Sequence, residues 1–282
     1  MAGSPTARRR RLSIELKKLR ESSGFTCAHV GTALDWSGSK VNRMETGTGR
    51  VQPSDVDALC RFYEVDDELR EFLKSLARQA KTKGWWQAHG DGVPGWFSIY
   101  IGLEQDASTF RQYRGEFIPG LMQTPAYAAE LHRAANQMAE DAIERAVHVR
   151  MERQARLLGP SAPDAWFVIH EGVLRSIIGG HAVMREQLEK MLDMMELPSV
   201  TLQVLTFDAG PYPATGTFTL LGFPDPEDPD LVYRDGLTDA VYLEETDEVR
   251  AYTRAFDNLR AAAASPYRSA ALIKSLLKEY TT

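Results

Sequence analysis

Apolar residues recur at helical spacing in five short segments within the first 78 residues. In the first, over residues 8–22, Leu12, Leu16 and Leu19 share one helix face. The other four segments cover residues 26–34, 37–45, 53–63 and 66–78. Helices this short are not stable alone in water, so all five must bury their apolar faces in one common core. The sequence therefore predicts an all-α five-helix domain over residues 1–80.

The third segment, DWSGSKVNRMETG at residues 35–47, has few apolar residues for a helix. Ser37 can cap its start, and Gly47 can adopt the left-handed conformation that ends it. Only Val41 and Met44 are apolar between them. A helix with so narrow an apolar stripe must be held by its neighbours while most of its surface stays free. The free surface carries hydrogen-bond donors, namely Ser39, Lys40, Asn42 and Arg43.

The second and third segments together have the form of a helix-turn-helix, two short helices joined by a tight turn. The stretch GFTCAHVGTALDWSGSKVNRMETG resembles the lambda-repressor-like, Xre-type DNA-binding family. It follows that family's pattern of Gly-apolar-Thr, a helix, a turn, and then Ser-x-Ser-x-apolar-x-Arg-apolar-Glu-x-Gly. The resemblance implies that the third helix enters the major groove of double-stranded DNA at a pseudo-palindromic operator.

Nine residues are predicted to contact DNA: Thr26, Cys27, Ser37, Gly38, Ser39, Lys40, Asn42, Arg43 and Arg50. An arginine can bind guanine through two hydrogen bonds, and an asparagine can bind adenine in the same way. The family often has glutamine where Cys27 and Gly38 stand here, so direct base recognition rests on fewer side chains. Arg43 has a competing interpretation, in which it pairs with Glu45 or with a carboxylate of the fourth helix and only braces the fold.

Charge is divided unevenly along the chain. Residues 1–83 hold 16 Lys and Arg against 11 Asp and Glu, whereas residues 84–282 hold 17 against 28. A basic module joined to an acidic domain is typical of a protein that binds a polyanion. Four adjacent cations, Arg8, Arg9, Arg10 and Arg11, are predicted to form an arm that contacts phosphates without adding sequence preference. The competing interpretation is a solvated start that only aids solubility.

The composition changes at residue 81. Residues 81–97 hold three tryptophans, Trp85, Trp86 and Trp96, together with four glycines and a proline. We interpret this stretch as a linker. Its aromatic rings could form a platform for a planar ligand, or they could be buried as anchors between domains, which is the more common use of large rings.

Residues 98–282 predict a second domain of the α+β class with a mostly antiparallel sheet flanked by helices. Helical spacing is found at residues 99–116, 124–135, 139–159, 181–197, 248–263 and 266–280. After Pro163, five runs are short, rich in β-branched and aromatic residues, and bounded by turn residues, so we expect five strands. These runs are AWFVIH, VTLQVLTF, TFTLLGF, LVYRD and AVYLEE.

This second domain also carries a resemblance. The stretches GWWQ, IPGLMQTPAYA, VTLQVLTFDAG and FTLLGFPDPEDPDLVY look like those of the actinomycete Xre-type regulators whose C-terminal domain defines the WhiJ-like group. That resemblance implies a transcription factor, often encoded beside a small partner protein in toxin–antitoxin-like pairs, and no established catalytic residue. We expect a dimeric regulator whose second domain dimerises or binds the small protein. The alternative is a ligand-gated regulator whose second domain senses a small molecule.

Other functions find little support in the sequence. No GxSxG, P-loop, GxGxxG or HExxH motif occurs, so we do not expect an enzyme. Two cysteines, Cys27 and Cys60, and scattered histidines offer no metal-ligand spacing, and no cofactor is implied. No apolar run approaches the roughly 18 residues of a membrane helix. We therefore expect a cytoplasmic protein without membrane contact.

Overall fold

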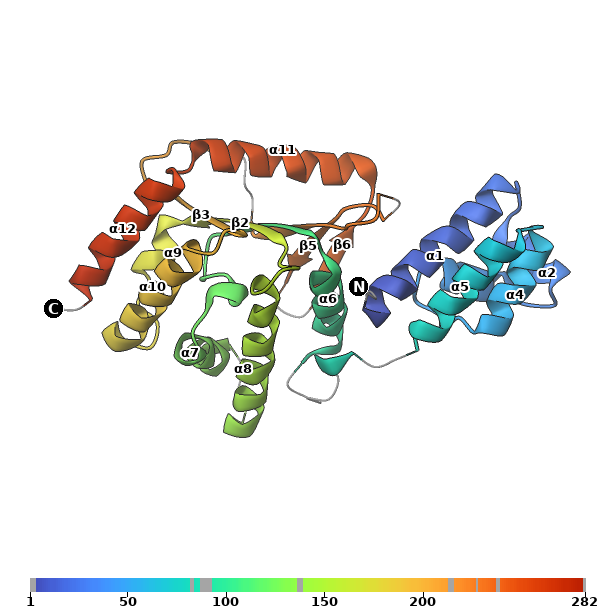
Figure 1. The fold of residues 1–282 in the computed structure, drawn as a ribbon, viewed down its shortest axis with the longest axis horizontal. Coiled ribbons are helices and arrows are strands. Elements are labelled where there is room, and N and C mark those ends of the chain that lie inside the picture. Colours follow the sequence, from blue (N-terminus) through green and yellow to red (C-terminus); the bar gives the residue numbers. More distant parts are fainter. Residues whose placement is uncertain are drawn as a thin grey trace. The chain divides into compact units, whose positions relative to one another are not determined.

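The structure is a computed structural model of the 282-residue chain. It describes residues 4–81, 84–86, 93–135, 139–212, 216–226, 228–236 and 239–280. The chain divides into two compact units, Met1–Trp85 and Trp86–Thr282 (Figure 1).

The first unit is helical, as the spacing of its apolar residues predicts. Its helices are α1 (Pro5–Ser22), α2 (Cys27–Ala33), α3 (Gly38–Glu45), α4 (Pro53–Phe62) and α5 (Asp67–Gln79). Side chains of Ser4, Thr26, Ser37 and Asp66 accept hydrogen bonds from first-turn amides, which stabilises helices too short to be stable alone. The shared core includes leucines of α1, α4 and α5 together with Val30, Val41 and Met44.

The second unit combines helices with one sheet. The helices are α6 (Gly95–Asp106), α7 (Pro125–Ala135), α8 (Glu140–Gln154), α9 (Glu171–Arg175), α10 (His181–Met195), α11 (Thr246–Ala262) and α12 (Pro266–Glu279), with short 3-10 turns at Gly120–Met122 and Ala155–Leu157. The strands are β1 (Thr109–Arg114), β2 (Asp164–His170), β3 (Val200–Leu205), β4 (Phe218–Gly222), β5 (Leu231–Asp235) and β6 (Ala240–Leu243).

The sheet is mixed, so the expectation of a mostly antiparallel sheet is wrong. Its strand order is β3-β2-β1-β4-β5-β6, in which β1, β2 and β3 run parallel and β4, β5 and β6 pair antiparallel. Five strands correspond to the five predicted runs, but β1 lies in a stretch that the sequence assigns to a helix. Its sequence, TFRQYR, is polar for a strand inside a sheet, and the buried Gln112 amide lies 2.7 Å from the Thr219 hydroxyl of β4. The neighbouring strand β4 thus satisfies the Gln112 side chain. Because Thr219 is 107 residues away in the sequence, no local pattern shows that β1 is a strand.

Helices cover both faces of this sheet (Figure 1). On one face, Phe110, Phe167 and Leu202 pack in a core that also contains residues of α6, α10 and α12. On the other face, Val168 and its neighbours pack against Phe256 and Leu259 of α11. Alternate residues of each strand point to opposite faces, which explains why the strand runs are apolar almost throughout.

Candidate nucleic-acid interface

The turn between α2 and α3 is unusually tight. Trp36 donates its backbone N–H to the Gly31 carbonyl at 2.7 Å. A Cβ atom on Gly31 would lie 2.8 Å from the Gly38 nitrogen and 2.9 Å from the Trp36 carbonyl oxygen, closer than side chains approach backbone. Asp35, inside the turn, has a φ of 55°. The glycine therefore permits the contact that fixes the angle between the two helices.

The inner face of α3 is held firmly. Val41 and Met44 are each 1% exposed in the core of the unit. Ser13 of α1 donates its hydroxyl to the Met44 carbonyl at 2.7 Å. At the end of the helix, the Glu45 carboxylate accepts hydrogen bonds from Arg20 at 2.8–3.0 Å. These contacts fix the rotation of α3 about its own axis.

The outer face of α3 is exposed. Ser39, Asn42 and Arg43 point away from the core, and their side chains make no hydrogen bond or ion pair with any residue that the structure describes. The bracing role considered for Arg43 is taken by other residues. Arg20 binds Glu45, and Lys40 binds the α4 carboxylate of Asp55. Arg43 is therefore left available for an external partner.

Lys40 differs from the other predicted contact residues. Its Nζ lies 2.7 Å from Asp55 Oδ1 and 3.7 Å from the centre of the Trp36 ring. These contacts tie α3 to α4 and to the turn. Lys40 thus contributes charge to the outer surface from a position fixed by the fold, whereas Asn42 and Arg43 are free to turn toward a ligand.

Cys27 and Thr26 lie at the start of α2. The Thr26 hydroxyl accepts a hydrogen bond from the His29 amide at 3.2 Å, as a helix cap does. Cys27 Sγ lies 3.8 Å from Glu45 Oε2, and burial, reinforced by the Glu45 charge, raises the pKa of its thiol. The hydrogen bond with Glu45 raises the pKa of Arg20. Cys27 is therefore a protonated, half-buried thiol.

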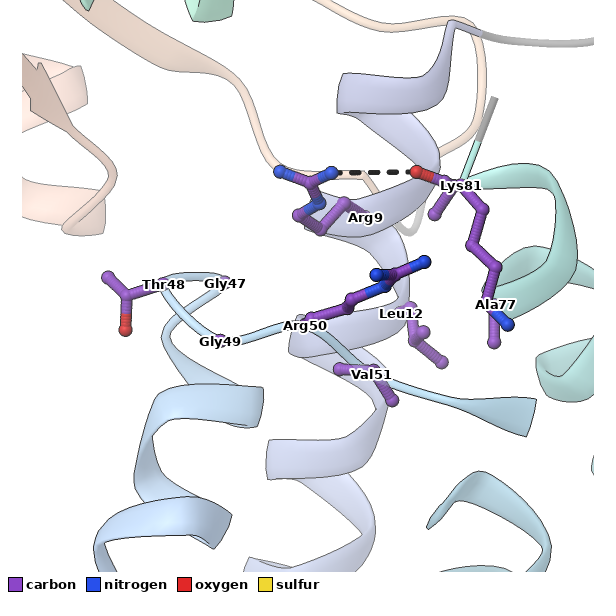
Figure 2. A pocket seen from close by; sticks show the side chains of 10 residues that line it. Arg9, Leu12, Gly47, Thr48, Gly49, Arg50, Val51, Ala77 and Lys81 are labelled. Atoms are coloured by element: carbon purple, nitrogen blue, oxygen red, sulfur yellow. Dashed lines mark hydrogen bonds between the residues drawn. The ribbon is translucent and has the colours of Figure 1, made fainter. Parts of the chain in front are cut away.

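Two basic cavities lie beside the loop that follows α3. The first, of about 380 Å³, is lined by Lys40, Arg43, Met44, Thr48, Gly49 and Arg50. The second, of about 340 Å³, shares the loop residues Thr48, Gly49 and Arg50 with the first. Arg9, Lys81 and apolar neighbours complete its lining (Figure 2). Neither lining contains a carboxylate. Arg50 links the two, so positive charge continues from α3 across the loop to the start of α1.

The four arginines at residues 8–11 belong to α1, which starts three residues earlier than the sequence predicts. Ser4 caps this helix and Pro5 occupies its first position, which favours an early start. Arg11 Nε lies 3.1 Å from Glu15. Arg9 is exposed, and its Nη2 lies 3.5 Å from the Ala80 carbonyl oxygen at the edge of the second cavity (Figure 2).

Comparison with known protein families accounts for both units. The family described as "Domain of unknown function (DUF5753)" matches residues 97–275, which is more than half of the chain. The chain belongs to this family. A family described as a helix-turn-helix domain matches residues 11–73, which include α2, α3 and the turn between them. No curated protein and no solved structure matches the chain significantly.

The tryptophans near the start of the DUF5753 domain differ in their surroundings. Trp86 is 1% exposed, and its indole Nε1 donates to Ser98 Oγ at 2.7 Å. A ring so fully covered has no face open to a planar ligand, and its hydrogen-bond partner Ser98 lies in the same unit. Trp85 is half-buried. The side chain of Trp96 and residues 87–92 lie outside the described residues.

The sequence did not reveal which polar residues brace the domain. Neither the pairing of Arg20 with Glu45 nor that of Lys40 with Asp55 follows from helical spacing, because each joins two helices. The sequence likewise did not indicate that Lys81 lines a basic cavity. Within the described ranges, no group of three or more His, Cys, Asp or Glu is arranged to hold a metal ion, and no helix is long and apolar enough to cross a membrane.

Proposed function

We propose that this protein is a sequence-specific transcriptional regulator that binds double-stranded DNA through α3. One observation carries the proposal. The inner face of α3 is fixed by buried contacts, while Asn42 and Arg43 on its outer face have no partner among the described residues. A rigid helix with unpaired donors, flanked by basic cavities, is what major-groove recognition requires.

The roles of the residues follow from their positions. Asn42 and Arg43 can reach base edges, adenine and guanine being their preferred partners. Ser39 and the amides at the starts of α2 and α3 can donate to phosphate oxygens, because helix N-termini attract anions. Arg50 and Lys40 add positive charge beside the helix. Recognition of an Xre-type operator would then rest on two base-reading side chains and several phosphate contacts.

A gel-shift assay of the full chain on its own upstream DNA tests this proposal. Asn42→Ala and Arg43→Ala should each weaken specific binding by about 1–3 kcal/mol, which is the discrimination expected of one good base contact. Arg61→Ala is the matched control, because Arg61 is an exposed arginine of α4 that pairs with Asp57. If both α3 variants bound as tightly as the control, another surface would have to contact DNA.

We further propose a homodimer on a pseudo-palindromic operator. One α3 helix contacts only a few base pairs, so two copies with half-sites about 34 Å apart are needed for a unique site. The net negative charge of residues 84–282 keeps the DUF5753 domain off DNA and makes it the suitable place for pairing. Light scattering that showed a monomer both free and on operator DNA would refute this.

The sequence resemblance also supports an antitoxin-like role, in which the DUF5753 domain binds a small protein encoded next to it. Co-expression with the adjacent small open reading frame, followed by size-exclusion chromatography, tests it. A stable complex that survives the Arg43→Ala substitution is the expected result, because the proposed partner site lies outside the first unit. Separate elution at micromolar concentration would exclude a stable pair.

A further inference from the structure

Cations surround the turn at residues 118–124 of the DUF5753 domain: Arg153 is buried, whereas Arg150 and Lys190 are half-buried. Arg150 and Arg153 lie on α8, and Lys190 lies on α10. The Glu104 carboxylate of α6 binds Arg153 through two hydrogen bonds, of 2.7 and 2.8 Å. Arg150 and Lys190 make no ion pair with any carboxylate in the described part of the chain. Neither cation therefore has a carboxylate in direct contact, although the charges of Glu104 and Glu186 act on Arg150 and Lys190 from farther away.

Arg150 has unused hydrogen-bond donors. Its Nη1 donates to the Gln123 side-chain oxygen, whereas its Nε and Nη2 have no hydrogen-bond partner among the described residues. Burial, followed by the charge of Arg153, lowers the pKa of Arg150 to about 9. A half-buried charge without a carboxylate beside it lacks part of the compensation that an ion pair would give. The Nε and Nη2 edge of a guanidinium is the edge that binds a carboxylate or phosphate through two parallel hydrogen bonds.

Gly120 of the turn lies beside the Arg150 and Arg153 side chains. A Cβ atom at Gly120 would lie 3.9 Å from Arg150 Nε and 4.0 Å from Arg153 Nη1. The absence of a side chain therefore leaves the space of a methyl group beside both guanidinium groups. His132 of α7 adds a second unpaired group, because its Nε2 is buried without a hydrogen-bond partner in the described structure. The charge of Arg150 acts on His132 and, after burial, lowers its pKa further.

A purely structural role does not account for Arg150. The turn is held by other side chains. Gln154 donates to the Gly120 and Gln123 carbonyls at 3.0 and 2.7 Å, and Gln187 donates to the Met122 carbonyl at 2.7 Å. Lys190 also donates to the Gln123 carbonyl, at 2.9 Å. Arg150 adds one hydrogen bond to a neutral amide, for which a positive charge is unnecessary.

We propose that Arg150, beside Gly120 and His132, binds the oxyanion of a small molecule that carries a carboxylate or phosphate group. The bound oxyanion would accept hydrogen bonds from Nε and Nη2 and neutralise part of the excess charge. The site lies wholly in the DUF5753 domain, so it stands independently of DNA binding by α3. In a ligand-gated regulator, this site would hold the ligand. It does not involve the tryptophans near the start of the domain.

Differential scanning fluorimetry of the full chain tests the site. Inorganic phosphate and succinate are each titrated at constant ionic strength, with sodium chloride as reference. At least one should raise the melting temperature saturably, because a ligand that binds only the folded state stabilises it. Which of the two acts distinguishes a phosphate ligand from a carboxylate ligand.

Variants assign the effect to Arg150. Arg150→Gln should abolish the response, and Arg145→Gln should keep it, because Arg145 lies on the same helix and pairs with the exposed Asp141. Gly120→Ala fills the space beside the guanidinium without a backbone clash and should weaken the apparent affinity at least tenfold, which keeps the test valid if Arg150→Gln does not fold. No rise with either anion above the chloride reference, or an equal rise in Arg150→Gln or Gly120→Ala, would overturn the proposal. The gel shift with the α3 variants tests DNA binding alone, so its outcome does not depend on whether this site binds an anion.

Discussion

The strongest prediction from the structure concerns Gly31→Ala, which would place a side chain in the tight turn between α2 and α3. A Cβ atom there would meet the Gly38 nitrogen at 2.8 Å, the Trp36 oxygen at 2.9 Å and the Ser37 carbonyl carbon at 3.0 Å. All three atoms belong to the backbone of the turn, so no side chain can rotate away. The first turn of α3 would have to move by several tenths of an ångström away from α2.

Two opposing effects set the magnitude. Overpacking of this kind costs about 1–3 kcal/mol. Alanine is favoured over glycine inside a helix by about 1 kcal/mol, which offsets part of that cost. We therefore expect a net destabilisation of about 0–2 kcal/mol, and a larger loss of specific DNA binding because the angle of α3 changes.

Urea unfolding of the segment 1–80 measures the first effect, and a gel shift with full-length protein measures the second. Gly115→Ala is the control for the gel shift with full-length protein, because its Cβ would meet only the Tyr113 side chain, at 3.5 and 3.9 Å. A Gly31→Ala protein that was more stable by the full helix-propensity gain, and that bound its operator normally, would refute the argument that this close approach fixes α3.

Three further predictions concern charge. Lys40→Ala should lower the stability of the first unit, measured by urea unfolding, because Asp55 loses its cationic partner; an unchanged midpoint would show that this ion pair does not stabilise the unit measurably. Arg9→Ala should weaken binding to specific and random DNA by a similar factor and reduce the salt dependence, as a phosphate contact does; a change of operator preference in gel shifts would contradict this. Burial lowers the pKa of His132 to about 4, below its value of about 6.5 in an unfolded chain, so its contribution to stability is present above pH 6.5 and is lost as the pH falls toward 4. His132→Phe should therefore flatten the acid side of the melting-temperature profile, and an unaltered profile would show that folding does not lower the pKa of His132.

The helical first unit and the position of α3 could be predicted from the sequence. Val41 and Met44 mark the buried stripe, and Ser37 and Gly47 mark the two ends. These signals are local, because capping and helical spacing depend on residues within a few positions of each other. The five apolar strand runs could be predicted for the same reason.

Contacts between distant residues were decided only by the tertiary structure. The strand β1 could not be recognised, because Gln112 is satisfied by Thr219, 107 residues away. One parallel pairing, of β1 with β2, depends on this strand; the other, of β2 with β3, joins two predicted runs whose relative direction the sequence did not show. Arg20 and Lys40 likewise form ion pairs with carboxylates of other helices, and Arg43 stays exposed. Arg150 lacks such a partner, a fact that appears only when α8, α10 and the turn at residues 118–124 are brought together, because charge pairing depends on distance in space.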